Sequence, residues 1–151
     1  MIKMLHRAMY KAMIASGIRV QNYGTVIVTL ADEDKEEAVP LIRRFYDMGF
    51  NIEATSSTAE TLKHHGIRTK VLRKPSEGSR EILDAISAGY VSYVINTRAI
   101  LSGIHYEDGA AIRSAASQNH VTMFTSLDTV RVLLDVLEEI TIGVSAITEE
   151  E

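Results

Sequence analysis

The chain has 151 residues, a length typical of one domain and too short for two large ones. It contains no cysteine, which excludes disulfides, thiolate metal sites and a cysteine nucleophile. The net charge of −4 argues against a broad basic surface for nucleic acid, and no apolar run approaches the roughly 18 residues of a membrane span. The first residues lack the pattern of a signal peptide. We therefore expect a cytoplasmic domain without a nucleic-acid or membrane partner.

The N-terminal segment is expected either to stand ahead of the main domain as an appendage or to pack on the core as a simple N-terminal helix. Residues 3–15 carry apolar side chains at helical spacing, a Ser-Gly pair would end this helix, and a polar break follows at 21–24. The C-terminal residues ITEEE are acidic and are expected to fray. The predicted division is a helix and linker over 1–22, a main domain over 23–143 and an acidic tail over 144–151.

Five short apolar runs alternate with segments of helical spacing in the main domain. The run TVIVTL at 25–30 is continuous and β-branched, which is typical of a parallel strand buried on both faces. The other predicted strands are 50–54, 69–72, 91–96 and 121–125. The helices between and after them are expected to begin near Asp32 or Asp34, Ser57, Ser79, Asp108, and Ser126 or Asp128. This alternation predicts an α/β fold with three layers: a five-stranded, mainly parallel sheet with helices on both faces.

Two of these helix starts carry specific expectations. Pro40 lies inside the first helical pattern of the main domain and removes one hydrogen bond, which predicts a kink or a late start. Asp32 or Asp34 could cap that helix. Ser57 and Glu60 have the spacing of a capping box, which by itself would explain both residues without a ligand.

Polar and cationic side chains follow the predicted strands. In sheets of this kind, ligands bind just beyond the carboxyl ends of the strands. The turn after the second strand precedes a helix N-terminus, where free amides and the helix dipole favour an anion. The pattern predicts a phosphate site, with an amide available for a sugar or base. Its residues are Lys35, Thr55, Ser56, Ser57, Thr58, Lys74, Asn96, Thr97 and Arg98.

Histidines and carboxylates do not predict a metal site. His64 and His65 are adjacent on a helix and point about 100° apart. His105 and His120 have no partner at metal-ligand spacing. The carboxylates of residues 32–34 are expected to form a solvated helix start.

A resemblance to a known family rests on five segments in a fixed order: DEDKEEAV, GFNIEATSSTAETL, VLRKPSEG, YVINT and TSLDTVRVLLDVLEEIT. Together they resemble the C-terminal regulatory domain of the carbamoyl phosphate synthetase large chain, over roughly residues 23–143. AMYKAMIASGI is similar to the end of the preceding synthetase domain and its linker. The resemblance implies a methylglyoxal-synthase-like fold that regulates carbamoyl phosphate synthesis for pyrimidine and arginine biosynthesis.

The same resemblance implies ligands, partners and site residues. The expected effector is a phosphorylated metabolite, UMP or phosphoribosyl pyrophosphate, and the expected partners are the rest of the large chain and its glutaminase small chain. This domain would hold no cofactor, whereas the whole enzyme would use ATP and Mg or Mn. Carried over residue by residue, the effector site falls on Lys35, Thr55, Thr58, Lys74, Asn96 and Asp108.

The chain departs from the family pattern at two positions. Arg98 stands where some members have threonine or an apolar residue, and Ser57 stands where a glycine is frequent. Because a guanidinium can bind phosphate through two parallel hydrogen bonds, Arg98 predicts a preference for an effector with more than one phosphoryl group. The alternative is that Arg98 has no role in ligand binding and lies in solvent or pairs with Glu107 or Asp108.

Three other functions compete with regulation. Methylglyoxal synthase needs an ATGTTG-type turn and a GGDQQ-type segment with a catalytic aspartate, whereas this chain has ATSSTA and KPSEGSRE. The cyclohydrolase domain of purine biosynthesis shares the fold but has longer loops. A structural domain without any ligand is the third alternative. We predict that the chain alone is not an enzyme and belongs to a glutamine-hydrolysing, ATP-dependent synthetase.

Overall fold

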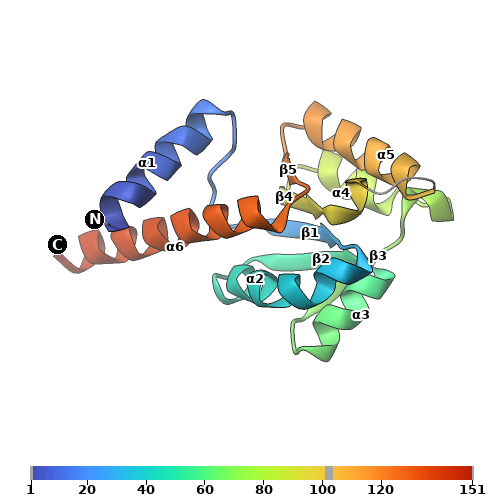
Figure 1. Cartoon of the computed structure of the whole chain (residues 1–151), viewed down its shortest axis with the longest axis horizontal. Coiled ribbons are helices and arrows are strands. Elements are labelled where there is room, and N and C mark those ends of the chain that lie inside the picture. Colours follow the sequence, from blue (N-terminus) through green and yellow to red (C-terminus); the bar gives the residue numbers. More distant parts are fainter. Residues whose placement is uncertain (1, 101–103, 151) are drawn as a thin grey trace.

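A single parallel sheet organises the protein. The computed structural model describes the backbone of residues 2–100 and 104–150, and side chains over 7–98 and 108–141 (Figure 1). The strand order is β3-β2-β1-β4-β5, and every neighbouring pair is parallel. The strands are β1 (Thr25–Thr29), β2 (Asn51–Thr55), β3 (Thr69–Leu72), β4 (Val91–Asn96) and β5 (Thr122–Phe124). The predicted α/β sheet is confirmed, and within the described residues it is parallel throughout.

Helices cover both faces of this sheet, as the strand pattern predicted. They are α1 (Ile2–Ala15), α2 (Lys35–Asp47), α3 (Ser56–His64), α4 (Glu81–Ser87), α5 (Ile104–Gln118) and α6 (Leu127–Glu150). One buried cluster joins α2, α3 and α6 to one face of the sheet, and a second joins α4 and α5 to the other. Helix α1 packs along α6, and both termini lie at the same end of the molecule (Figure 1).

The alternation of side chains along β1 explains the two clusters. Val26 and Val28 point into the cluster beneath α2 and α6, whereas Ile27 points into the cluster beneath α4 and α5. All three side chains are fully buried, which is why the sequence shows a continuous apolar run rather than an alternating one. Tyr93 adds an aromatic centre to the first cluster, with its ring 5.9 Å from that of Phe124.

The helix that contains Pro40 begins at Lys35, where the sequence placed its start, so the expected late start is wrong. A 3-10 turn, η1 (Asp32–Asp34), precedes α2, and the helix then runs without a break from Lys35. Pro40 lies on the exposed side, where solvent can satisfy the carbonyl that lost its amide partner. Asp34 occupies the N-cap position of α2, as predicted, but its side chain makes no capping hydrogen bond.

Two predicted capping residues, Ser57 and Asp108, do not cap their helices. Helix α3 begins directly after β2, so Thr55 is its N-cap and Ser57 lies within its first turn, with no capping box to Glu60. Asp108 lies inside α5 instead of capping it. Part of the stretch expected to be irregular, 97–107, forms the 3-10 turn η3 (Thr97–Ile100) and the first turn of α5. Helix α6 continues to Glu150, and none of the described helices is long and apolar enough to cross a membrane.

Candidate functional site

A narrow hollow lies beyond the carboxyl ends of β1, β2 and β4. Its volume is about 10 Å³, close to the room that one water molecule needs. We call it the strand-end hollow. Its walls are Thr29, Thr55, Lys74, Asn96, Arg98, Asp108, Gly109 and Ile112. The sheet therefore brings together Thr55, Lys74, Asn96, Arg98 and Asp108 of the predicted site.

The chemistry of the strand-end hollow combines two cations with an unpaired acceptor. Lys74 and Arg98 are half-buried, so their charges act where solvent screens them only in part. Asn96 is 1% exposed, and its Oδ1 atom has no hydrogen-bond partner among the described residues. A buried acceptor without a partner costs about 1–3 kcal/mol, and a ligand donor would recover that cost. The hollow thus offers positive charge for an anion and an acceptor for a hydroxyl or N–H group.

Asp108 closes one side of the hollow by holding the loop after β3. Its two carboxylate oxygens accept hydrogen bonds from the backbone amide and the hydroxyl of Ser76, each at 2.8 Å. Ser76 belongs to the 3-10 turn η2 (Pro75–Glu77), which directly follows Lys74. The contact therefore fixes the turn that presents the Lys74 side chain to the hollow.

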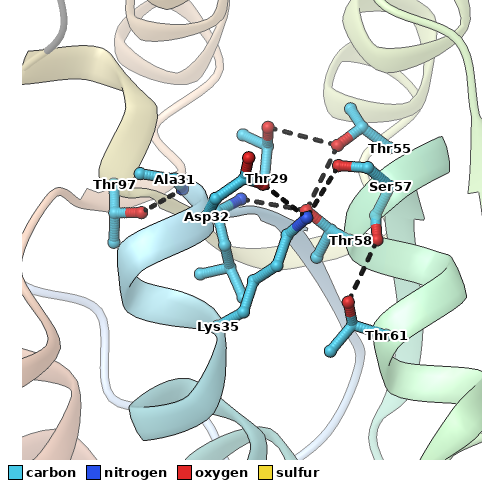
Figure 2. Close-up of polar contacts among 10 residues, drawn as sticks. Thr29, Ala31, Asp32, Lys35, Thr55, Ser57, Thr58, Thr61 and Thr97 are labelled. Atoms are coloured by element: carbon cyan, nitrogen blue, oxygen red, sulfur yellow. Dashed lines mark hydrogen bonds and ion pairs between the residues drawn. The ribbon is translucent and has the colours of Figure 1, made fainter.

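Two predicted threonines face the protein backbone instead of the hollow. The buried hydroxyl of Thr58 accepts a hydrogen bond from the Leu30 amide at 3.1 Å. The buried hydroxyl of Thr97 accepts one from the next amide, that of Ala31, at 2.8 Å. Figure 2 shows both threonines directed at the chain that leaves β1. Their role in the structure is to hold this segment between α3 and η3.

Lys35 forms a separate contact at the start of α3. Its Nζ atom lies 2.7 Å from a carboxylate oxygen of Asp32 and donates a hydrogen bond to the Ser57 hydroxyl at 3.0 Å (Figure 2). The Lys35 side chain is 17% exposed, while Ser56 and Ser57 are exposed. None of the three lines the strand-end hollow. Thr55 connects the two places, because it lines the hollow and also forms the N-cap of α3.

The sequence did not indicate four residues that line the hollow or bond to a residue lining it: Thr29, Ser76, Gly109 and Ile112. The rule that ligands bind at strand ends could have found Thr29, since it is the last residue of β1. The other three depend on how α5 packs on the loop after β3, which no local pattern reveals. No group of three histidines, aspartates or glutamates among the described residues is placed to hold a metal ion.

Comparison with known proteins agrees with this architecture. A family model described as the MGS-like domain matches residues 37–125. The crystal structure of a methylglyoxal synthase from Elizabethkingia anophelis NUHP1 superimposes with a TM-score of 0.61 at 18% sequence identity. That match covers 76% of this chain and 79% of the other. At this sequence identity the match shows that the two proteins share a fold, and nothing more. By the family match over more than half of its length, the chain belongs to the MGS-like domain family.

Proposed function

We propose that this chain is the effector-binding, regulatory domain of a carbamoyl phosphate synthetase large chain. Its ligand would be a phosphorylated metabolite of the pyrimidine pathway, UMP or phosphoribosyl pyrophosphate. The observation that carries the proposal is the buried Oδ1 of Asn96, which has no hydrogen-bond partner among the described residues and lines the same hollow as the cations Lys74 and Arg98.

The two halves of that observation select the ligand class. Lys74 and Arg98 provide the charge-assisted hydrogen bonds that a phosphoryl group needs. The Asn96 oxygen accepts hydrogen bonds, so it needs a ligand that also carries a donor, such as a sugar hydroxyl. Inorganic phosphate has no such extended donor, whereas a phosphorylated ribose combines both groups. Because the hollow is narrow, it would have to widen for such a ligand to enter.

A lyase activity like that of methylglyoxal synthase is less well supported. The turn after β3 reads Lys74-Pro75-Ser76-Glu77 and carries no aspartate at the place where the resemblance expects a catalytic base. Asp108 does line the hollow, but both of its oxygens already accept hydrogen bonds from Ser76. Asp108 therefore serves to hold the turn after β3.

Regulation requires that the effector bind two states of the synthetase with different affinity. Couplings of this kind amount to about 1–3 kcal/mol. In the proposed enzyme, the synthetase domains of the large chain would supply the second state and the glutaminase small chain the ammonia. ATP with Mg or Mn would act in those other domains, and the enzyme would be cytoplasmic.

Calorimetry of the purified chain tests the proposal. UMP, IMP and phosphoribosyl pyrophosphate are titrated into the wild type, into Lys74→Ala and into the control Lys63→Ala, an exposed lysine of α3. Loss of a charge-assisted contact of about 1.5–3 kcal/mol lowers affinity roughly ten- to a hundredfold in Lys74→Ala and leaves the control unchanged. Wild-type chain that binds none of the three, or that turns over dihydroxyacetone phosphate, contradicts the proposal.

A further inference from the structure

A second hollow lies at the opposite end of the sheet, where the strands begin. Its volume is about 640 Å³. Thr25 and Asn51, the first residues of β1 and β2, lie in its wall, together with Arg68 just before β3 and Tyr90 just before β4. In a parallel sheet these positions are all at the amino ends. This amino-end hollow is therefore separate from the strand-end hollow.

The amino-end hollow contains a buried carboxylate with little support. Glu53 is 6% exposed and lines the hollow. Its one hydrogen bond within the described residues comes from the Tyr90 hydroxyl, at 3.3 Å. Lys70 is its register neighbour on β3, yet no ion pair joins the two among the described residues. A buried carboxylate is costly unless a cation or several donors compensate it, so Glu53 has unused capacity for a cationic group.

Tyr90 lies beside this carboxylate, and two further aromatic side chains line the hollow from the other face of the sheet. Tyr46, Phe50 and Tyr90 line the same hollow, and Tyr90 is 42% exposed. Burial and the charge of Glu53 raise the pKa of Tyr90, so its hydroxyl remains a donor to Glu53 at neutral pH. Ring faces attract ammonium groups and exclude water around them. The place beside Glu53 and Tyr90 thus suits a primary ammonium group.

The rim of the hollow has the opposite charge. Arg68 and Lys70 line it and are exposed. A simple amine would meet these two cations on entry and would be repelled by them. A ligand that carries an anionic group at its other end would be attracted instead. The charge pattern therefore selects a molecule with both an ammonium and an anionic group.

We infer that the amino-end hollow binds a small zwitterion. Its ammonium group would contact the Glu53 carboxylate beside Tyr90, and its carboxylate would face Arg68 and Lys70. This inference does not rest on the proposed effector site, because the two hollows share no lining residue.

The test is a titration of the whole chain with ω-amino acids, followed by calorimetry and by backbone amide shifts in NMR. The probes are 4-aminobutyrate, 5-aminopentanoate and 6-aminohexanoate, with butylamine and butyrate as comparators that each lack one charge. We expect millimolar or tighter binding of at least one ω-amino acid, shifts at Glu53 and Tyr90, and binding about tenfold weaker or more for both comparators.

Two variants separate recognition from folding. Glu53→Gln keeps the shape and an acceptor for Tyr90 but removes the charge, and should weaken ω-amino acid binding about tenfold or more. Glu60→Gln makes the same change on the exposed face of α3 and should have no effect. Should Glu53→Gln fail to fold, Arg68→Ala changes an exposed side chain and should also weaken binding about tenfold.

Several results would overturn the inference. The first is that the wild type binds no ω-amino acid. The second is that Glu53→Gln, or Arg68→Ala if Glu53→Gln does not fold, binds ω-amino acids as tightly as the wild type does. The third is that butylamine binds as tightly as 4-aminobutyrate. Lys74→Ala should leave this binding unchanged, so failure here and failure of the proposed effector site give different results.

Discussion

Replacing Thr58 by valine should destabilise the fold, although the sequence alone suggested a ligand-binding role for its hydroxyl. Thr58 is fully buried, and its Oγ1 atom accepts a hydrogen bond from the amide of Leu30, which is also fully buried. Valine has nearly the same shape but no acceptor. The substitution therefore leaves the Leu30 amide without a partner and without access to solvent.

The expected cost follows from that single amide. A buried donor left unpaired costs about 1–3 kcal/mol. The Thr55 hydroxyl also points at Thr58, at 3.5 Å, but it keeps a contact with Thr29 at 3.2 Å and so adds little. For a domain of about this size, 1 kcal/mol corresponds to roughly 2–4 °C in Tm. We expect a loss of about 2 kcal/mol in the free energy of unfolding and a fall in Tm of roughly 4–8 °C.

Urea denaturation and thermal melts measure this cost against a matched control. Thr61→Val makes the same change in the same helix, where the hydroxyl is half-buried and donates to the Ser57 carbonyl at 3.3 Å. Solvent can replace that bond, so the control should lose no more than about 0.5 kcal/mol. If Thr58→Val proves as stable as Thr61→Val, the Leu30 amide does not depend on Thr58 and the reasoning fails.

Two further predictions concern Tyr93 and Arg98. Burial raises the pKa of Tyr93 to about 12, and its hydroxyl accepts from the Gln21 amide at 2.7 Å and donates to the Arg19 carbonyl at 2.8 Å. Because the folded pKa lies above the ordinary value of 10, this stabilisation is complete below pH 10 and is lost as the pH rises toward 12. The stability difference between wild type and Tyr93→Phe should therefore narrow over that range, whereas Tyr23→Phe, at a residue 67% exposed, should show no such trend. Arg98→Thr should weaken phosphoribosyl pyrophosphate more than UMP in calorimetry, and equal losses or none would reject a role of Arg98 in selecting a second phosphoryl group.

The strands could be predicted closely because burial on both faces leaves a direct trace in the sequence. The run predicted at 25–30 is observed as β1 (Thr25–Thr29), and the run at 91–96 is observed as β4 over the same residues. A parallel strand between two helical layers is buried on both faces, so it is mostly apolar in sequence. Layer order and parallel pairing then follow from the alternation of strands with helices.

The capping residues of the helices were less predictable, because residues of typical capping types form tertiary hydrogen bonds instead. Ser57 and Asp108 have typical capping residue types, yet Ser57 accepts a hydrogen bond from Lys35 and Asp108 bonds Ser76. Both partners come from other elements of the fold. Local spacing alone does not distinguish a hydroxyl or carboxylate that caps its own helix from one that binds a neighbouring segment.

The residues of the candidate site were also predictable only in part. The rule that ligands bind beyond the carboxyl ends of parallel strands predicted that Lys74, Asn96 and Arg98 lie close together, and all three line one hollow. The same rule could not distinguish threonines that line the hollow from threonines that hydrogen-bond to the backbone. Thr55 and Thr58 are three residues apart and both buried, yet only Thr55 lines the strand-end hollow. That difference arises from the direction of each side chain at the junction of β2 and α3.

This division decides how variants of the predicted site must be interpreted. Thr58 and Thr97 bond successive amides of the segment that leaves β1, so their loss displaces that segment whether or not a ligand is present. A drop in effector affinity in either variant would therefore not identify a ligand contact. Lys74 and Arg98 carry half-buried charges at the hollow, and removing either charge should change binding with little change in unfolding. Only variants of this second kind can establish that the strand-end hollow holds a phosphorylated ligand.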